Sequence, residues 1–167
     1  MFNSIIHQLE NAGILEEQFS KAQILCLPEN VLRTKDYHDL METTDMDRLA
    51  KLLRRSGLEV FTFMDAGVDL AAIDRRSGDR WLGTIWIRDN AAFPLLISVV
   101  AGIIVLGIDR KTDGSYSTPH VEPSPQVHVE LIIDKKSGDY DSLKYNGDGE
   151  TLIKILNALK DGEQSKN

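Results

Sequence analysis

The feature that most constrains this chain is an 18-residue segment without a charged side chain, Ala91 to Ile108. An uncharged apolar run of this length lies at the lower limit for a membrane-spanning helix, which needs about 20 such residues. Trp86 precedes the segment, and Arg110 and Lys111 follow it, as at the two borders of a membrane. The excess of basic residues before the segment would hold the amino-terminal part in the cytoplasm, with a single span in the inner or plasma membrane.

The same segment is also consistent with a buried crossover inside one domain. Asn90 can cap a helix over 91–101, Gly102 can end that helix, and 103–108 is then a fully buried strand. A membrane span would instead isolate the following hairpin and helix, about 55 residues with little core of their own. We therefore expect a buried helix-strand segment, and membrane anchoring through 91–108 is the alternative.

A recurrent local pattern supports the buried interpretation. The segments 73–79, 108–114 and 133–139 each contain an apolar residue, Asp, a basic pair, a hydroxyl residue and then a Gly/Asp pair. Such residues are typical of a turn, because Asp and hydroxyl side chains bond the turn backbone and glycine adopts positive φ. The pattern predicts three strand ends, including one at Ile108.

The remaining periodicity predicts an α+β fold. Residues 1–57 are expected to form a helix-rich lead-in that includes a buried strand at 22–28 and a strongly amphipathic helix, which Thr44 or Asp45 caps and Gly57 ends. From Leu58 the period changes to that of strands. The expected elements are an antiparallel meander of 58–64, 68–73 and 81–87, a hairpin of 126–133 and 140–145, and a helix over 149–159.

We expect these elements to form a mixed, largely antiparallel sheet with a helical amino-terminal region, a buried apolar helix-strand segment and a carboxy-terminal helix. The expected organisation is one α+β domain over 1–161, with a sheet-rich body at 58–161 and a polar tail at 162–167. A single domain is expected because a chain of 167 residues can bury one sizeable core but hardly two.

Charge and cysteine content exclude several classes of protein. The chain has 19 basic and 26 acidic residues, a net charge of -7, so it repels a phosphate backbone and is not a general nucleic-acid binder. Cys26 is the only cysteine, which excludes an intramolecular disulfide and a cysteine-built zinc site. The first residues do not have the charge pattern of a secretory signal. A reducing cytoplasm is the expected location.

Two His-x-Glu triplets are the candidate metal ligands. His120 and Glu122 form the first triplet, and His128 and Glu130 form the second. In an extended chain the His and Glu of one triplet point to the same side. Prolines around the first triplet make it loop-like, however, and such spacing is common by accident. We therefore expect neither a metal nor another cofactor.

Basic pairs at the predicted element ends are the candidate ligand-binding residues. If the hairpin tips gather, the pairs would form a positive rim for a phosphate-bearing ligand, a nucleotide or lipid headgroups. The simpler interpretation is that they keep apolar strands soluble. The residues of this basic rim are Arg75, Arg76, Arg110, Lys111, Lys135 and Lys136.

The sequence does not indicate a catalytic site. Cys26 lies in an apolar run that would bury its thiol and raise its pKa, and there is no Gly-x-Ser-x-Gly turn. The preferred function is therefore a non-catalytic module for protein–protein interaction or self-association, with a protein partner or a second copy of the chain. The alternatives are a membrane-tethered sensor or effector and a binder of small phosphate-bearing ligands or nucleotides.

Overall fold

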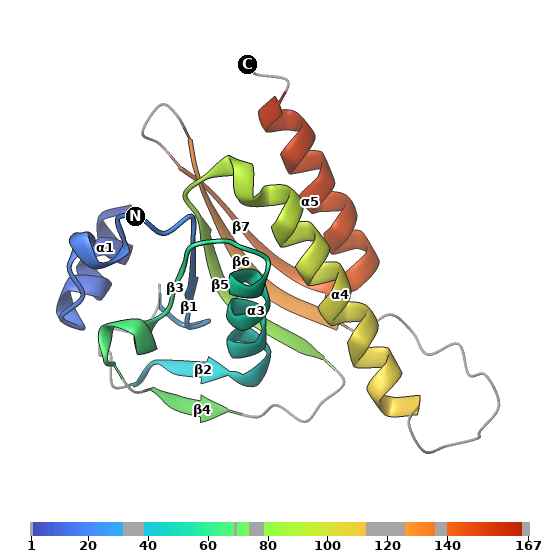
Figure 1. The fold of residues 1–167 in the computed structure, drawn as a ribbon, viewed down its shortest axis with the longest axis horizontal. Coiled ribbons are helices and arrows are strands. Elements are labelled where there is room, and N and C mark those ends of the chain that lie inside the picture. Colours follow the sequence, from blue (N-terminus) through green and yellow to red (C-terminus); the bar gives the residue numbers. More distant parts are fainter. Residues whose placement is uncertain are drawn as a thin grey trace.

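The structure, a computed structural model, describes residues 2–31, 39–68, 70–73, 79–112, 126–135 and 140–164. In these ranges the α-helices are α1 (Phe2–Asn11), α2 (Glu16–Phe19), α3 (Thr44–Arg55), α4 (Phe93–Thr112) and α5 (Gly149–Gln164). The strands are β1 (Ile24–Leu27), β2 (Met41–Thr43), β3 (Val60–Phe61), β4 (Ala71–Ile73), β5 (Arg80–Ile87), β6 (Gln126–Asp134) and β7 (Tyr140–Asp148). The arrangement of these helices and strands confirms the predicted α+β class (Figure 1).

The described strands form a five-stranded mixed sheet in the order β3-β1-β5-β6-β7 and a two-stranded sheet of β2 and β4. The β1–β5 and β6–β7 pairs are antiparallel, whereas β1–β3, β5–β6 and β2–β4 are parallel. The mixed sheet is thus confirmed, but its pairing is not largely antiparallel. The predicted meander is wrong, because a 3₁₀ turn, η2 (Phe63–Ala66), follows the short β3 and because β5 pairs with β1 and β6.

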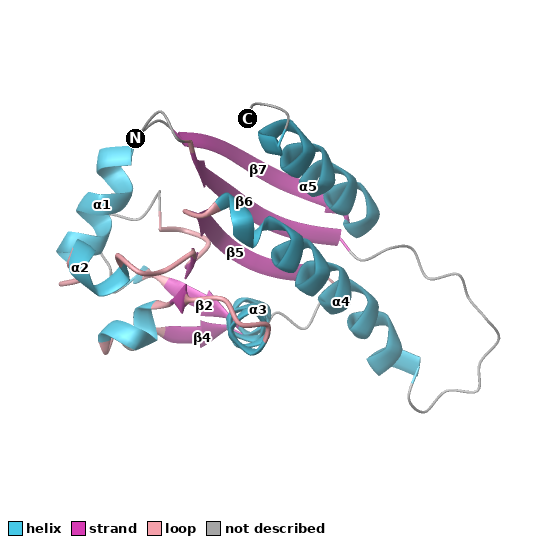
Figure 2. Ribbon diagram, turned by 45° about the horizontal axis from the view of Figure 1, so that its top comes forward, coloured by secondary structure: helices cyan, strands magenta, loops and turns pink. Residues whose placement is uncertain are grey.

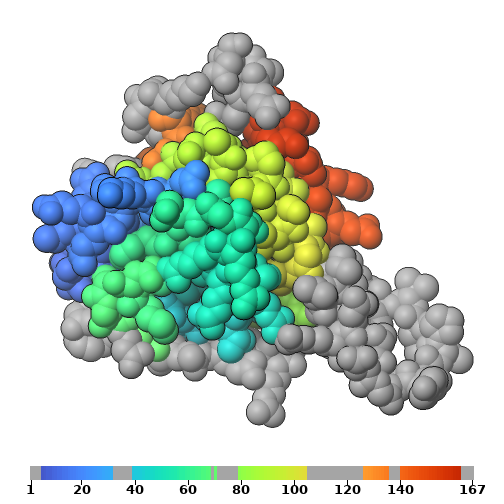
Figure 3. All heavy atoms as spheres, viewed as in Figure 1, coloured from blue at the N-terminus to red at the C-terminus, as the bar shows by residue number. Residues whose placement is uncertain are grey.

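Three helices cover one face of the large sheet. α4 connects the parallel strands β5 and β6, and such a crossover places the helix on the sheet. Figure 2 shows α4 and α5 lying across β5, β6 and β7, and Figure 3 shows the continuous surface that α3 and α4 form on this side. The sheet residues in this core are Ile24, Cys26, Leu82, Ile85, Ile87, Val127, Val129, Leu131 and Ile133.

The helices α1 and α2 pack in a second core on the opposite face of the sheet. The sheet residues in this core are Leu25, Leu27, Phe61, Trp86 and Ile132. Arg88 fastens α2 to the sheet, because its Nη1 donates to the carbonyl of Phe19 at 2.7 Å and its guanidinium lies 5.5 Å from the Trp86 ring centroid. The other half of this face, around His128 of β6, lies outside that core.

The uncharged segment is helical throughout, so the predicted strand over 103–108 is wrong. α4 continues through Gly102, although glycine inside a helix costs about 1 kcal/mol relative to alanine. Ile103 and Ile104 of α4 are buried in the core between α4 and the sheet, and this packing offsets the local preference of glycine for ending the helix. A strand had no place to pair beside β5, because β1 and β6 occupy its two sides.

The start of α4 also differs from the prediction. Asp89, rather than Asn90, caps the 3₁₀ turn η3 (Asn90–Ala92) that precedes α4, and its Oδ1 accepts the N–H of Ala91 at 3.0 Å. The recurrent pattern at 108–114 lies partly in α4 and is not a strand end. Among the helices in the described ranges, none has both the length and the apolar character needed to cross a membrane.

Several local predictions are confirmed. β1 is buried at every position, β6 and β7 form the predicted hairpin, and α5 follows directly. α3 ends before Gly57, which has φ +96°, as predicted. The predicted cap at Thr44 or Asp45 is wrong, because the hydroxyl of Thr43 caps the helix by accepting the N–H of Met46 at 3.2 Å. The boundaries of the lead-in, the body and the tail stay predictions.

Candidate functional site

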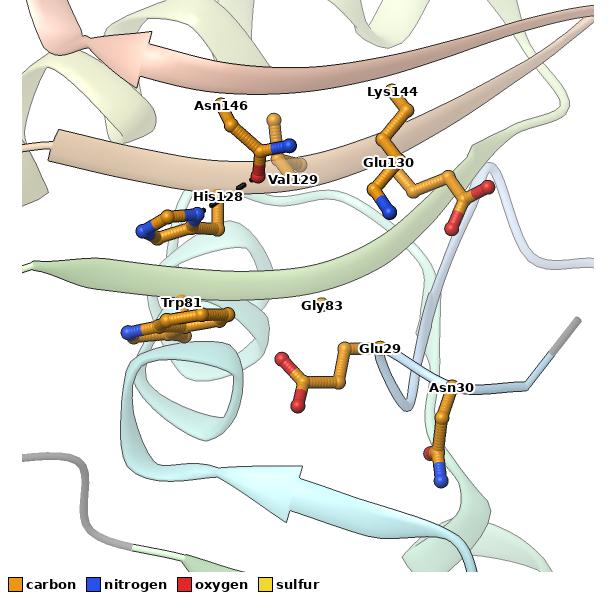
Figure 4. Close-up of a pocket in the computed structure, with 9 residues that line it drawn as sticks. All are labelled: Glu29, Asn30, Trp81, Gly83, His128, Val129, Glu130, Lys144 and Asn146. Atoms are coloured by element: carbon orange, nitrogen blue, oxygen red, sulfur yellow. Dashed lines mark hydrogen bonds between the residues drawn. The ribbon is translucent and has the colours of Figure 1, made fainter. Parts of the chain in front are cut away.

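A pocket of about 390 Å³ opens on the half of the sheet face that lies outside the core under α1 and α2. Its walls come from the segment after β1 and from β5, β6 and β7. The lining residues are Glu29, Asn30, Trp81, Gly83, His128, Val129, Glu130, Lys144 and Asn146 (Figure 4). Polar and aromatic side chains from several elements thus converge in one concavity, as they do in binding sites.

A stacked pair of rings forms one wall of the pocket. Trp81 and His128 are register partners on the parallel strands β5 and β6, and their ring centroids lie 3.8 Å apart at an interplanar angle of 14°. Residues at the start of α3 bind both the backbone N–H and the backbone carbonyl of Trp81. Its N–H donates to Oδ2 of Asp45 at 3.0 Å, and its carbonyl accepts the hydroxyl of Thr43. The aromatic wall is therefore fixed by a helix on the covered side of the sheet.

Polar contacts orient the His128 ring within the wall. Its Nδ1 lies 2.8 Å from Oδ1 of Asn146, and its Nε2 lies 3.3 Å from Oδ2 of Asp79. A carboxylate beside a histidine also occurs in sites of general base catalysis. Among the described lining residues, however, there is no serine, threonine or cysteine that such a base would activate.

Gly83 shapes the floor of the pocket through a bulge in β5. The register with β6 shifts between Trp81 and Gly83, and Gly83 has φ +76°. A Cβ at this position would lie 2.6 Å from the backbone carbonyl oxygen of Leu27, which is too close for any other residue. The next residue, Thr84, donates its hydroxyl to the carbonyl of Pro28 at 3.0 Å. This bond holds β5 against the segment that carries Glu29.

The pocket carries both signs of charge, with an acidic excess. Glu29 extends toward Trp81 from the segment after β1, whereas Glu130 lies on another side, on β6, with its carboxyl group directed away from Glu29 (Figure 4). Lys144 of β7 is the register partner of Glu130, and opposite charges facing each other across strands attract. A carboxylate has several acceptor positions, so a glutamate that contacts the protein can accept further donors from a ligand.

The structure describes two of the four candidate metal ligands. His128 and Glu130 lie on the same side of β6, as the alternation predicted, and both line the pocket. His120 and Glu122 lie outside the described residues. In the part of the chain that the structure describes, no group of three or more His, Cys, Asp or Glu side chains has the arrangement of a metal site.

The described members of the basic rim do not come together. Arg110 and Lys111 lie in the last turns of α4, whereas Lys135 follows the far end of β6 (Figure 1). Nζ of Lys135 forms an ion pair with Oδ1 of Asp141 at 3.0 Å. Arg75, Arg76 and Lys136 lie outside the described residues.

Cys26 is buried, as the sequence predicted. It lies in the core between the sheet and the three covering helices, and its burial raises the pKa of the thiol to about 12. A thiol in this state is a poor nucleophile, because the reactive form is the thiolate.

Sequence reasoning missed most of the pocket. Trp81, Lys144 and Asn146 showed no motif, and Glu29 was one acidic residue among many. The usable signal was the polar side of the strand at 126–133, where His128 and Glu130 alternate with apolar residues. Which strands pair with that side is decided by long-range contacts.

Comparison of the chain with models of known families, with curated proteins and with solved structures found no match. The chemistry of the pocket therefore carries the functional argument.

Proposed function

We propose that this chain is a non-catalytic interaction module that binds a positively charged segment of a partner protein. The observation that carries the proposal is the presence of two carboxylates, Glu29 and Glu130, on different sides of one open pocket. Lys144 is the one lysine among the nine lining residues, and none of them is an arginine. A cationic group entering the pocket gains charge-assisted hydrogen bonds to the carboxylates.

The charge of the whole chain supports a basic partner. The net charge of -7 attracts a positively charged segment before contact and increases the rate of encounter. A phosphate-bearing ligand would meet repulsion from the chain and from both pocket glutamates. The pocket therefore favours a cation over the phosphate ligand considered for the basic rim.

The position of the pocket suits a polypeptide ligand. Lys144 and Asn146 are exposed, and both belong to β7, the edge strand of the large sheet. A segment of another protein can approach across this edge without entering a closed cavity. In the described lining there is no hydroxyl or thiol nucleophile, which supports binding rather than covalent catalysis.

A titration of isotope-labelled protein with short glycine-flanked peptides, observed by amide NMR, tests this proposal. Peptides with one basic residue should shift the signals of Gly83, Glu130 and the Trp81 indole, and added salt should weaken the effect. Acidic and neutral peptides should leave these signals unchanged. Equal effects from all three peptides, or no effect at the pocket, would contradict the proposal.

Matched variants locate the effect in the pocket. Glu130→Gln removes one negative charge and keeps the side-chain shape, and we expect it to weaken binding of the basic peptide about tenfold. Glu17→Gln makes the same change on the exposed surface of α2 and should leave affinity almost unchanged. Turnover of a substrate that disappears in His128→Ala would show instead that the module is an enzyme.

A further inference from the structure

We infer that the pocket selects the guanidinium group of arginine over the ammonium group of lysine. This inference rests on the proposed function, because it names the chemical group that the same pocket receives. Three features of the pocket support it: two carboxylates on different sides, a planar aromatic wall, and a lysine of the chain already in the lining.

The placement of the carboxylates favours a planar cation with many donors. Glu29 and Glu130 come from different elements and reach the pocket from different sides (Figure 4). A guanidinium has donors along several edges of one plane, so it can bond the two oxygens of one carboxylate and keep donors for a further acceptor of the lining. An ammonium is a compact point charge without this planar pair of donors.

The aromatic wall favours the same group. The stacked rings of Trp81 and His128 present a rigid surface that cannot replace the water around a strongly hydrated ion. A guanidinium is more weakly hydrated than an ammonium and interacts favourably with aromatic rings. Its transfer from water into this pocket therefore loses less hydration free energy.

Lys144 supplies the third argument. Its register position places it opposite Glu130, so the pocket already contains an ammonium group from the protein itself. A lysine of the partner would repeat the interaction that Lys144 can make, and its charge would be repelled by Lys144. An arginine meets the same repulsion but offsets it with two parallel hydrogen bonds to one glutamate and with its contact to the aromatic wall. Removal of the Lys144 charge should therefore strengthen binding.

Three glycine-flanked peptides that contain arginine, lysine or citrulline test the inference on the full chain. Citrulline keeps the planar shape of arginine without its charge. NMR titration should give an affinity for the arginine peptide about tenfold higher than for the lysine peptide, with no measurable binding of the citrulline peptide. Glu29→Gln should lower the affinity for the arginine peptide about tenfold, and Lys144→Met should raise it several-fold.

The outcomes separate this inference from the proposed function. If arginine and lysine peptides bind within twofold of each other at the pocket, the guanidinium preference is wrong and the proposed function stands. If neither basic peptide shifts the pocket signals, both are wrong. Amide spectra of each variant, recorded without peptide, confirm that the fold is retained. Glu17→Gln is the charge-matched control, and its affinity for the arginine peptide should equal that of the unaltered chain.

Discussion

The two sides of β6 have opposite chemistry, although their residues alternate along one strand. Val127, Val129, Leu131 and Ile133 are buried under α4 and α5. On the other side, His128 and Glu130 line the pocket, and only Ile132 enters the core with α1 and α2. The comparison separates two roles for neighbouring residues: one side stabilises the fold, and the other is available to a ligand.

The difference follows from which helices cover the sheet. α4 lies between β5 and β6 in the sequence as a crossover, so the side of β6 that faces it must be apolar. The short helices α1 and α2 cover less area on the opposite face. Polar side chains such as Glu130 stay partly exposed there and line the pocket.

The largest expected effect is the difference in stability loss between two adjacent positions of β6. Leu131→Ala should lower the free energy of unfolding by about 2–5 kcal/mol, because it leaves a cavity under α4 and α5. Glu130→Gln, one residue away on the pocket side, should change it by about 0.5 kcal/mol or less. Urea unfolding measures both values. Equal losses at the two positions would show that both sides of β6 are structural.

A second, smaller effect concerns pH on the covered side. Burial raises the pKa of Cys26 from 9.0 to about 12, so folding favours its neutral form. This contribution to stability is complete below pH 9 and is lost as pH rises toward 12, because the thiol of the unfolded chain ionises first. The stability difference between the unaltered chain and Cys26→Ala should therefore shift in favour of the variant above pH 9. A constant difference from pH 7 to 11 would contradict a buried thiol.

The smallest effect is expected at the junction of the pocket strand β7 with the covering helix α5. Oδ2 of Asp148 accepts the N–H of Thr151 at 2.9 Å, and this bond lowers the pKa of the carboxyl group below 3.8. Asp148→Ala should lower the Tm near pH 7 by about 2–4 °C. The loss should shrink as pH falls below 3.8, because protonation then weakens the cap in the unaltered chain.

Asp148→Asn keeps a capping oxygen but does not titrate, so it is the matched control for this prediction. Near pH 7 its Tm should be higher than that of Asp148→Ala. Thermal unfolding followed by circular dichroism at several pH values makes the comparison. A Tm difference that does not change with pH would assign the effect to helix propensity instead of the charged cap.

Local sequence signals predicted the parts of the fold that local physics controls. The alternation in 126–133, its pairing with 140–145 and the start of α5 at Gly149 were readable because each depends on residues close in sequence. The end of the helix in the uncharged segment was not. Gly102 indicated a stop, but the burial of Ile103 and Ile104 against the sheet kept the chain helical.

By itself, then, the sequence determined that this is an α+β chain with acidic charge, a buried cysteine and a strand whose two sides differ. Tertiary structure alone decided that Glu29 and Trp81 lie beside His128 and Lys144 in one pocket. The physical reason is that strand pairing joins segments that are distant in the sequence, and alternation shows which side is buried without showing which strand lies next to it.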